Sequence, residues 1–180
     1  MAAIFKRELK AYFKSPIGYI FIGLCILVAA VFFWIGNLAY GLANMGTFFS
    51  NVGVVYIIVI PILTMRSMAE ERKSRTDQLL MTAPVRTSDI VIGKFLAAVA
   101  VLTITCVVML LFPFILRLYG EIALGEIVIG FLGLYLMGVM FISIGILMST
   151  LTENQVIAAV STGAVLLLLW FMESIAGQVS

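Results

Sequence analysis

The fold is decided between Phe48 and Leu116, where the sequence reads FFSNVGVVYIIVIPILTM (48–65), RSMAEERKSRTDQLLMTAPVRTSDIVIGK (66–94) and FLAAVAVLTITCVVMLLFPFIL (95–116). Two apolar runs enclose a segment that carries 10 of the 20 charged residues of the chain, 11 basic and 9 acidic. A membrane-spanning helix needs about 20 mostly apolar residues, and both runs come close to that length. The charged segment is therefore expected to lie in water between two spans, where a soluble partner can reach it.

The composition of the whole chain agrees with a membrane location. Hydrophobic residues make up 63% and charged residues 11% of the 180 residues. A soluble domain is roughly half apolar and a quarter charged, and a small soluble fold could not bury this much apolar surface. Because irregular backbone cannot face lipid and the apolar runs are continuous, the sequence predicts an all-α integral membrane protein rather than a β-barrel.

Five apolar runs qualify, or nearly qualify, as spans. They cover residues 17–36, 48–65, 95–116, 127–149 and 156–172. The first run is longer than the apolar core of a secretory signal and has no A-x-A cleavage site, so it is expected to stay in the protein.

The basic residues predict the orientation of the chain. Ten of the eleven lie before the first span or between the second and third, and only Arg117 lies elsewhere. Since basic residues collect on the cytoplasmic side, the N-terminus and residues 66–94 are expected in the cytoplasm. Trp34 and Trp170 then fall at the outer ends of their spans, where interfacial aromatic residues are common.

The first 15 residues form a separate, amphipathic segment. On a helical wheel, Phe5, Leu9, Tyr12 and Phe13 lie within about 100° of each other. Four cations occupy the neighbouring arc: Lys6, Arg7, Lys10 and Lys14. The pattern predicts an interfacial helix over residues 1–15 whose cations face anionic lipid headgroups, and Ser15-Pro16 should end it. A plain flank of the first span is the alternative.

The charged segment 66–94 contains helical signals. Glu71 precedes Arg75 by four residues, and Glu70 precedes Lys73 by three, which favours a helix over residues 67–80. A turn is expected over residues 82–85, and Thr87 or Ser88 can cap the next helix. Lys94 then lies early in that helix and is expected to reach back to the headgroups. A solvated linker is the alternative, although linkers are usually shorter or richer in Gly and Ser.

Several kinds of chemistry are missing from the sequence. There is no G-x-x-x-x-G-K-[ST] loop for ATP and no histidine, which removes zincin motifs and most Ser-His or Cys-His catalysis. Cys25 and Cys106 both lie in apolar runs and are expected to be buried free thiols. Scattered methionines more often pack in a protein interior than bind Cu(I), so no metal site is expected. Because the catalytic motifs are missing, no catalytic residue is expected either.

Small residues and prolines in the spans predict how the helices pack. Ala159 and Gly163 lie four residues apart in the fifth run, and Gly138 is one of several glycines in the fourth. Such residues let helices approach closely. Pro61 and Pro113 can kink the second and third spans.

The charged segment also resembles a known family. RSMAEERKS (66–74), TDQLL (76–80) and TAPV (82–85) resemble the segment after the second span of ABC-2 type permeases. The resemblance continues in IVIGKF (90–95), FKREL (5–9), SPIGY (15–19) and LTENQ (151–155), and it is closest to the gliding-motility-associated permease group. At Arg75 this group more often has glycine, so the sequence departs from the pattern there.

The resemblance implies an N-terminal connecting helix, six spans and a coupling helix between the second and third. It implies that permeases pair as homodimers or heterodimers in the inner (plasma) membrane, in contact with membrane lipids and not with nucleic acid. ATP and Mg would be held by a separate cytoplasmic ABC ATPase, so no cofactor is expected in this chain. The residues implied in ATPase coupling are Glu70, Glu71, Arg72, Lys73 and Asp77.

Two functions remain open at this point. The first is the permease subunit of an ATP-driven exporter, with residues 1–180 as one transmembrane domain that lacks its sixth span at the C-terminus. The second is a non-transporting assembly or regulatory subunit that docks the same ATPase. A secondary transporter is disfavoured because the spans contain no mid-membrane carboxylates. The few polar groups in the spans favour an amphiphilic or lipid-linked substrate.

Overall fold

The computed structural model describes residues 2–39, 45–70, 87–117 and 124–179, and only the backbone of residue 87 and of residues 173–179. Within these ranges the chain forms helices and no strand. Five helical stretches are long and apolar enough to cross a membrane: Pro16–Leu38, Gly46–Thr64, Ser88–Leu116, Leu124–Leu151 and Gln155–Met172. The all-α membrane fold is therefore confirmed, and four of the five predicted spans are placed to within a few residues. The third begins several residues earlier than predicted.

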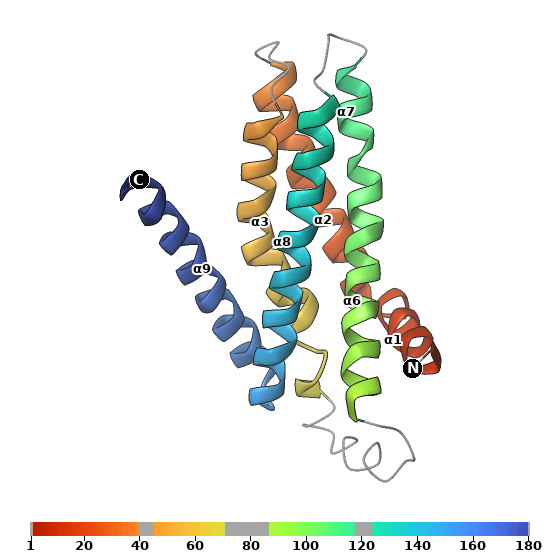
Figure 1. Ribbon diagram of the computed structural model, residues 1–180. Coiled ribbons are helices and arrows are strands. Elements are labelled where there is room, and N and C mark those ends of the chain that lie inside the picture. Colours follow the sequence, from red (N-terminus) through yellow and green to blue (C-terminus); the bar gives the residue numbers. More distant parts are fainter. Residues whose placement is uncertain (1, 40–44, 71–86, 118–123, 180) are drawn as a thin grey trace.

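The interfacial segment is a separate helix, α1 (Ala2–Lys14), at one end of the bundle (Figure 1). Ser15 has an extended backbone (φ −91°, ψ 156°), and Pro16 opens α2 (Pro16–Phe33) because proline suits the first helical turn. The first turn of α2 passes very close to α1. A Cβ at Gly18 would lie 2.7 Å from the carbonyl oxygen of Tyr12, so only glycine fits this corner. Leu9, Tyr12 and Phe13 pack against the hydrophobic core.

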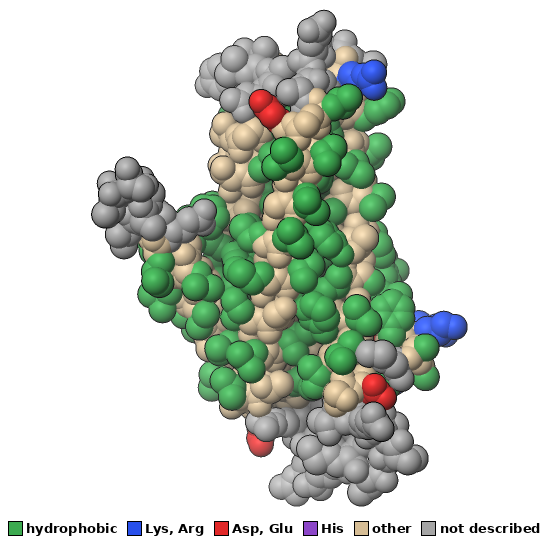
Figure 2. Space-filling model, viewed as in Figure 1, with side chains coloured by type: hydrophobic (Ala, Val, Ile, Leu, Met, Phe, Trp, Pro, Cys, Tyr) green, Lys and Arg blue, Asp and Glu red, His purple; other side chains and the backbone are tan. Residues whose placement is uncertain are grey.

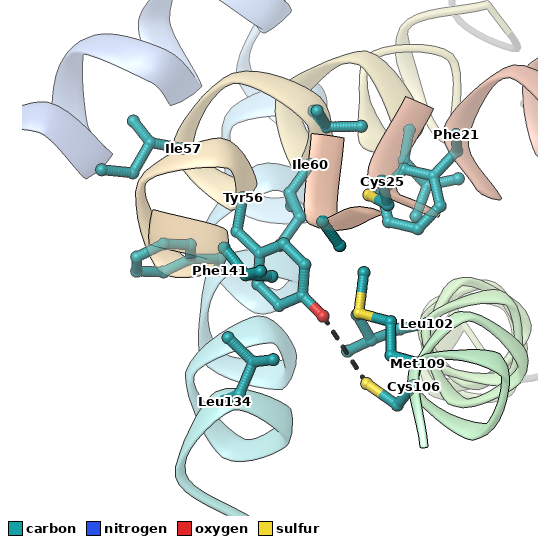
Figure 3. Packing of buried hydrophobic residues seen from close by; sticks show 14 of the residues in the cluster. Phe21, Cys25, Tyr56, Ile57, Ile60, Leu102, Cys106, Met109, Leu134 and Phe141 are labelled. Atoms are coloured by element: carbon teal, nitrogen blue, oxygen red, sulfur yellow. Dashed lines mark hydrogen bonds between the residues drawn. The ribbon is translucent and has the colours of Figure 1, made fainter. Parts of the chain in front are cut away.

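The second span, α3 (Gly46–Thr64), lies at the centre of the core. Half of its most apolar stretch of 18 residues is buried, which is the largest share among the five described spans. Tyr56 of α3 is fully buried, and its hydroxyl lies 3.5 Å from the Cys106 Sγ (Figure 3). Cys25 and Cys106 are buried free thiols, as predicted. At its C-terminal end, α2 continues directly into the π-helical turn η1 (Trp34–Leu38).

Pro113 explains why the third span has two parts. Helix α6 (Thr87–Met109) and helix α7 (Leu111–Leu116) are separated by Leu110. Proline has no N–H, so Pro113 cannot donate to the carbonyl of Met109 four residues earlier. The interruption lies where that hydrogen bond is missing, and it agrees with the kink predicted from the sequence.

Glycines of α8 (Leu124–Leu151) bring this helix close to α3 and α6. A Cβ at Gly138 would lie 2.7 Å from the Leu102 side chain and 3.1 Å from the Tyr56 ring. A Cβ at Gly145 would overlap the Thr64 side chain. Gly138 therefore lies at a helix–helix contact, as expected for a small residue.

The last helix, α9 (Gln155–Val179), runs at an angle to α8, and the two helices diverge in Figure 1. Only 17% of the most apolar 18 residues of α9 are buried, which is the smallest share among the five described spans. Ala158, Thr162 and Leu166 are buried and follow one another at four-residue spacing. Gly163 lies beside this stripe, and a Cβ there would meet nothing within 4 Å. At Gly163 the predicted close contact is therefore not made within the described part of this chain.

The outer surface is divided by polarity along the long axis of the bundle. Figure 2 shows hydrophobic side chains over the middle of the visible face and the described charges near its two ends. Exposed apolar side chains occur on α2, α6, α8 and α9, and include Leu27, Val107, Ile129 and Leu168. Such a large exposed apolar surface requires lipid contact. The chain is therefore a multi-pass membrane protein.

Candidate functional site

Polar side chains from four parts of the chain meet at the end of the bundle where α1 lies. They come from α1, from residues 65–70 after α3, from the start of α6 and from the end of α8. We call this set the α1-end junction. Its members are Glu8, Tyr12, Arg66, Ser67, Glu70, Lys94 and Ser149.

Lys94 is the buried cation of the junction. Its Nζ donates a hydrogen bond of 2.5 Å to the Ser67 carbonyl oxygen and lies 3.5 Å from the Glu8 Oε2. The residue is only 2% exposed, so its charge is matched inside the protein. The prediction that Lys94 reaches back to the headgroups is wrong. The helix starts earlier than the predicted span, which places Lys94 against residue 67 and α1 instead.

Ser149 joins the end of α8 to the backbone that follows α3. Its Oγ accepts hydrogen bonds from the N–H groups of Met68 (3.0 Å) and Ala69 (3.1 Å) and donates one to the Met65 carbonyl oxygen (3.3 Å). The backbone turns at residues 65–68 and is helical again at residues 69 and 70. N–H groups at a helix start have no partner within the helix, so Ser149 satisfies two of them from another helix.

Arg66 and Glu70 form a two-pronged ion pair one helical turn apart. The Arg66 Nε and Nη2 each donate to one Glu70 oxygen at 2.6 Å. The hydrogen bonds from Arg66 hold the pKa of the Glu70 carboxyl below its usual value, so Glu70 is ionised at neutral pH. Both side chains are partly exposed, which limits the stabilisation to about 1 kcal/mol or less.

A small pocket of about 90 Å³ lies between α1 and residues 66–70. Tyr12 lines it and donates a long hydrogen bond of 3.5 Å to the Leu63 carbonyl oxygen. Burial raises the pKa of the Tyr12 hydroxyl, so Tyr12 stays neutral. Ser67 Oγ is buried and has no hydrogen-bond partner in the described part of the chain.

The structure places only part of the predicted coupling set. Glu70 lies in the junction, whereas Glu71, Arg72, Lys73 and Asp77 lie outside the described residues. The predicted helix over residues 67–80 and the turn over residues 82–85 fall almost wholly outside as well. On α1, Lys6, Lys10 and Lys14 are exposed, and Arg7 forms a 2.8 Å ion pair with Glu8. Contact of these cations with lipid stays a prediction.

Sequence reasoning missed Glu8, Tyr12, Ser67 and Ser149 as members of the junction. Glu8 gave the one available signal, because a single acidic residue among four cations suggests a specific partner. No group of three or more Cys, Asp or Glu side chains in the described residues could hold a metal ion. The contacts described above for the junction are hydrogen bonds and ion pairs that hold one helix against another.

These observations define a polytopic helical membrane protein with a charged segment fastened to its bundle at one end. The sequence matches the ABC-2 family transporter proteins over residues 37–176, about three quarters of the chain. The chain therefore belongs to the ABC-2 transporter family. Among curated proteins and among solved structures, nothing matches it significantly.

Family membership adds two general statements. An ABC-2 membrane protein is a component of membrane transport and is not itself the ATPase, and it normally works with a cytoplasmic ABC ATPase. The match includes segment 66–94 and the junction residues that follow α3 or lie on α6 and α8, but it does not reach α1.

Proposed function

We propose that this chain is the permease subunit of an ATP-driven exporter, in which a separate cytoplasmic subunit hydrolyses ATP. The observation that supports this proposal is that the family match includes segment 66–94. Hydrogen bonds with Ser149 and Lys94 hold the start of this segment against the bundle. A segment held in this way can transmit a displacement to the spans. A freely hinged linker would absorb it.

The proposed substrate is amphiphilic or lipid-linked. The five described spans have mean hydropathies between 2.0 and 2.8, and Glu126 and Glu153 lie near helix ends. A water-filled path for a charged solute would need polar groups deep in the membrane. Surfaces that are apolar along their whole length suit a substrate that keeps a hydrocarbon part in lipid.

The proposed arrangement places the α1 end in the cytoplasm of an inner (plasma) membrane and pairs two permeases in a homodimer or heterodimer. Segment 66–94 is then the docking surface for the ATPase, with Glu70, Glu71, Arg72, Lys73 and Asp77 as contact residues. The basic residues before the first span and in this segment support that orientation.

Reversing two acidic residues tests the docking surface. The double variant Glu70→Lys, Glu71→Lys changes these positions from two negative to two positive charges. If they face basic groups of the ATPase, like charges then meet across a partly dry contact, which weakens association by several kcal/mol. We expect loss of ATPase copurification and of substrate-stimulated hydrolysis. The assay uses the full-length permease with its natural ATPase in lipid.

Because Glu70 also pairs with Arg66, the variant Arg66→Gln serves as the control. It breaks the internal ion pair without reversing the acidic charge, so it should retain the ATPase. Full ATPase retention and full hydrolysis in the double reversal would contradict docking through these acids. ATPase retention by the wild type with no response to any amphiphilic substrate would favour an assembly or regulatory subunit.

A further inference from the structure

We propose that Ser149 is a positioning residue that fastens the ATPase-docking segment to α8, so that displacement of the segment is passed first to α8. This inference rests on the proposed function, because it names the helix that receives the motion. Ser149 itself touches neither ATP nor the transported molecule.

The hydroxyl of Ser149 differs from those of the other described Ser and Thr residues of α8. Ser143 Oγ donates to the Val139 carbonyl oxygen at 3.0 Å, and Thr150 Oγ1 donates to the Leu147 carbonyl oxygen at 2.6 Å. Both bond back to their own helix, which is the usual behaviour of Ser and Thr in spans. All the hydrogen bonds of Ser149 described above go instead to residues 65–69, about 80 positions away in the sequence.

Burial makes these hydrogen bonds hard to replace. Ser149 is 0% exposed, and so is Ala69, whose N–H it accepts. If the hydroxyl were removed, the buried N–H of Ala69 and the part-buried N–H of Met68 would lose their acceptor, and water could not easily take its place at Ala69. The segment would then keep its covalent link to α3 but lose its link to α8.

The contact continues from Ser149 into the bundle. Gly145 lies one helical turn earlier on α8 and packs directly on Thr64 at the end of α3. Gly138 lies two further turns away and packs on Tyr56 and Leu102. Because close-packed glycine contacts leave little space for sliding, α8 and the end of α3 should move as one body. Ser149 is the residue of α8 through which the segment is hydrogen-bonded to these two helices.

Hydrogen exchange tests the hydrogen bonds without any ATPase. In Ser149→Ala, exchange of the Met68 and Ala69 amides should rise roughly two- to thirty-fold, as expected for loss of a helix-start acceptor. Ser149→Thr keeps an oxygen at this position and should restore protection. Ser143→Ala removes an exposed hydroxyl from the same helix and is the matched control. Unchanged exchange in Ser149→Ala would overturn the contact itself.

Reconstitution with the ATPase tests the relay. We expect Ser149→Ala to copurify with the ATPase as well as the wild type does, but to lose most substrate-stimulated hydrolysis, while Ser143→Ala behaves as wild type. Full stimulation in Ser149→Ala, together with raised amide exchange, would overturn the relay and leave the exporter function intact. Failure of the wild type to bind any ATPase would overturn the proposed function and the relay, whereas the exchange result would still stand for the contact.

Discussion

The ammonium group of Lys94 is a charge placed where water does not reach it. A buried cation is tolerated only when its attraction to nearby groups offsets the loss of hydration. Ser67 and Glu8 supply that attraction from two other parts of the chain. Lys94 thus ties α1 to the start of segment 66–94, and the Glu8 carboxylate is the α1 group in this link.

Neutralising Glu8 tests this dependence. Glu8→Gln should lower the free energy of unfolding by about 1–3 kcal/mol, because the buried ammonium keeps a weaker partner. The measurement is the thermal midpoint of the solubilised protein. Lys10→Gln removes an exposed charge from the same helix and should change stability by less than about 0.5 kcal/mol.

A second substitution separates the ion pair from simple packing. Adding Lys94→Met to Glu8→Gln removes the buried cation that faces the neutralised side chain, so the double variant should recover part of the lost stability. Equal midpoints for Glu8→Gln and Lys10→Gln would show that the 3.5 Å contact carries little energy.

The junction could be predicted only in part from the sequence. Glu70 was expected to matter because it opens a charged segment with helical spacing. Ser149 and Lys94 could not be assigned, because their partners are backbone groups 80 and 27 positions away. No local pattern marks the residue that will meet a distant N–H or carbonyl group, and long charged side chains at span ends usually do reach water.

At the scale of helices, α8 shows which small residues are constrained by packing. Gly145 and Gly138 face neighbouring side chains, whereas Gly163 of α9 faces open space. The sequence contains all three as similar small residues in apolar runs. What separates them is the rotation of each helix about its axis.

Alanine substitutions at two glycines test this difference. Gly145→Ala should destabilise the solubilised protein by about 1–3 kcal/mol, since the added Cβ overlaps Thr64 in a close-packed contact. Gly163→Ala should be neutral or stabilising by up to about 1 kcal/mol, because alanine favours the helix and meets nothing. Thermal midpoints compare the two variants.

Relieving the overlap provides the control for Gly145. Combining Gly145→Ala with Thr64→Ala removes two of the three atoms that the new Cβ meets, Oγ1 and Cγ2, and leaves the Cβ of residue 64 at 2.9 Å, so the two effects should be less than additive. A larger loss for Gly163→Ala than for Gly145→Ala would contradict the packing described for α8 and α9.

The limits of the helices show what hydropathy can predict. The span end at Leu116 agrees with the sequence, because lipid imposes a minimum apolar length on any helix. The third span starts earlier than expected because Ser88–Lys94 continues the helix beyond the apolar run. A hydropathy pattern identifies the apolar part of a helix, but it does not detect a polar extension of the helix that is buried by the fold.

At the scale of the whole molecule, the distribution of basic residues predicts one orientation. Among the described residues, Lys6, Arg66 and Lys94 lie at the α1 end, and Arg117 lies at the opposite end. If the α1 end is cytoplasmic, single cysteines at Ser74 and Glu153 should react with a membrane-impermeant thiol reagent only after permeabilisation. A cysteine at Asn44 should react in intact cells.

The background for this experiment lacks both native thiols. Cys25→Ala and Cys106→Ala remove them, although the second also removes the contact with Tyr56. The cysteine at Asn44 reports that intact cells admit the reagent to the outer face. Reaction at Ser74 in intact cells would reverse the orientation.

The narrow contact stripe of α9 has a consequence for biosynthesis. Of the five described spans, α9 is synthesised last and buries the smallest share of its surface. By the time it leaves the translocon, the partners of Lys94, Tyr56 and Gly145 have all been made. The first four spans can therefore assemble before α9 arrives, and α9 can reside in lipid on its own until it docks through Ala158, Thr162 and Leu166. Among the five described spans, α9 would then be inserted into lipid before it packs against the others.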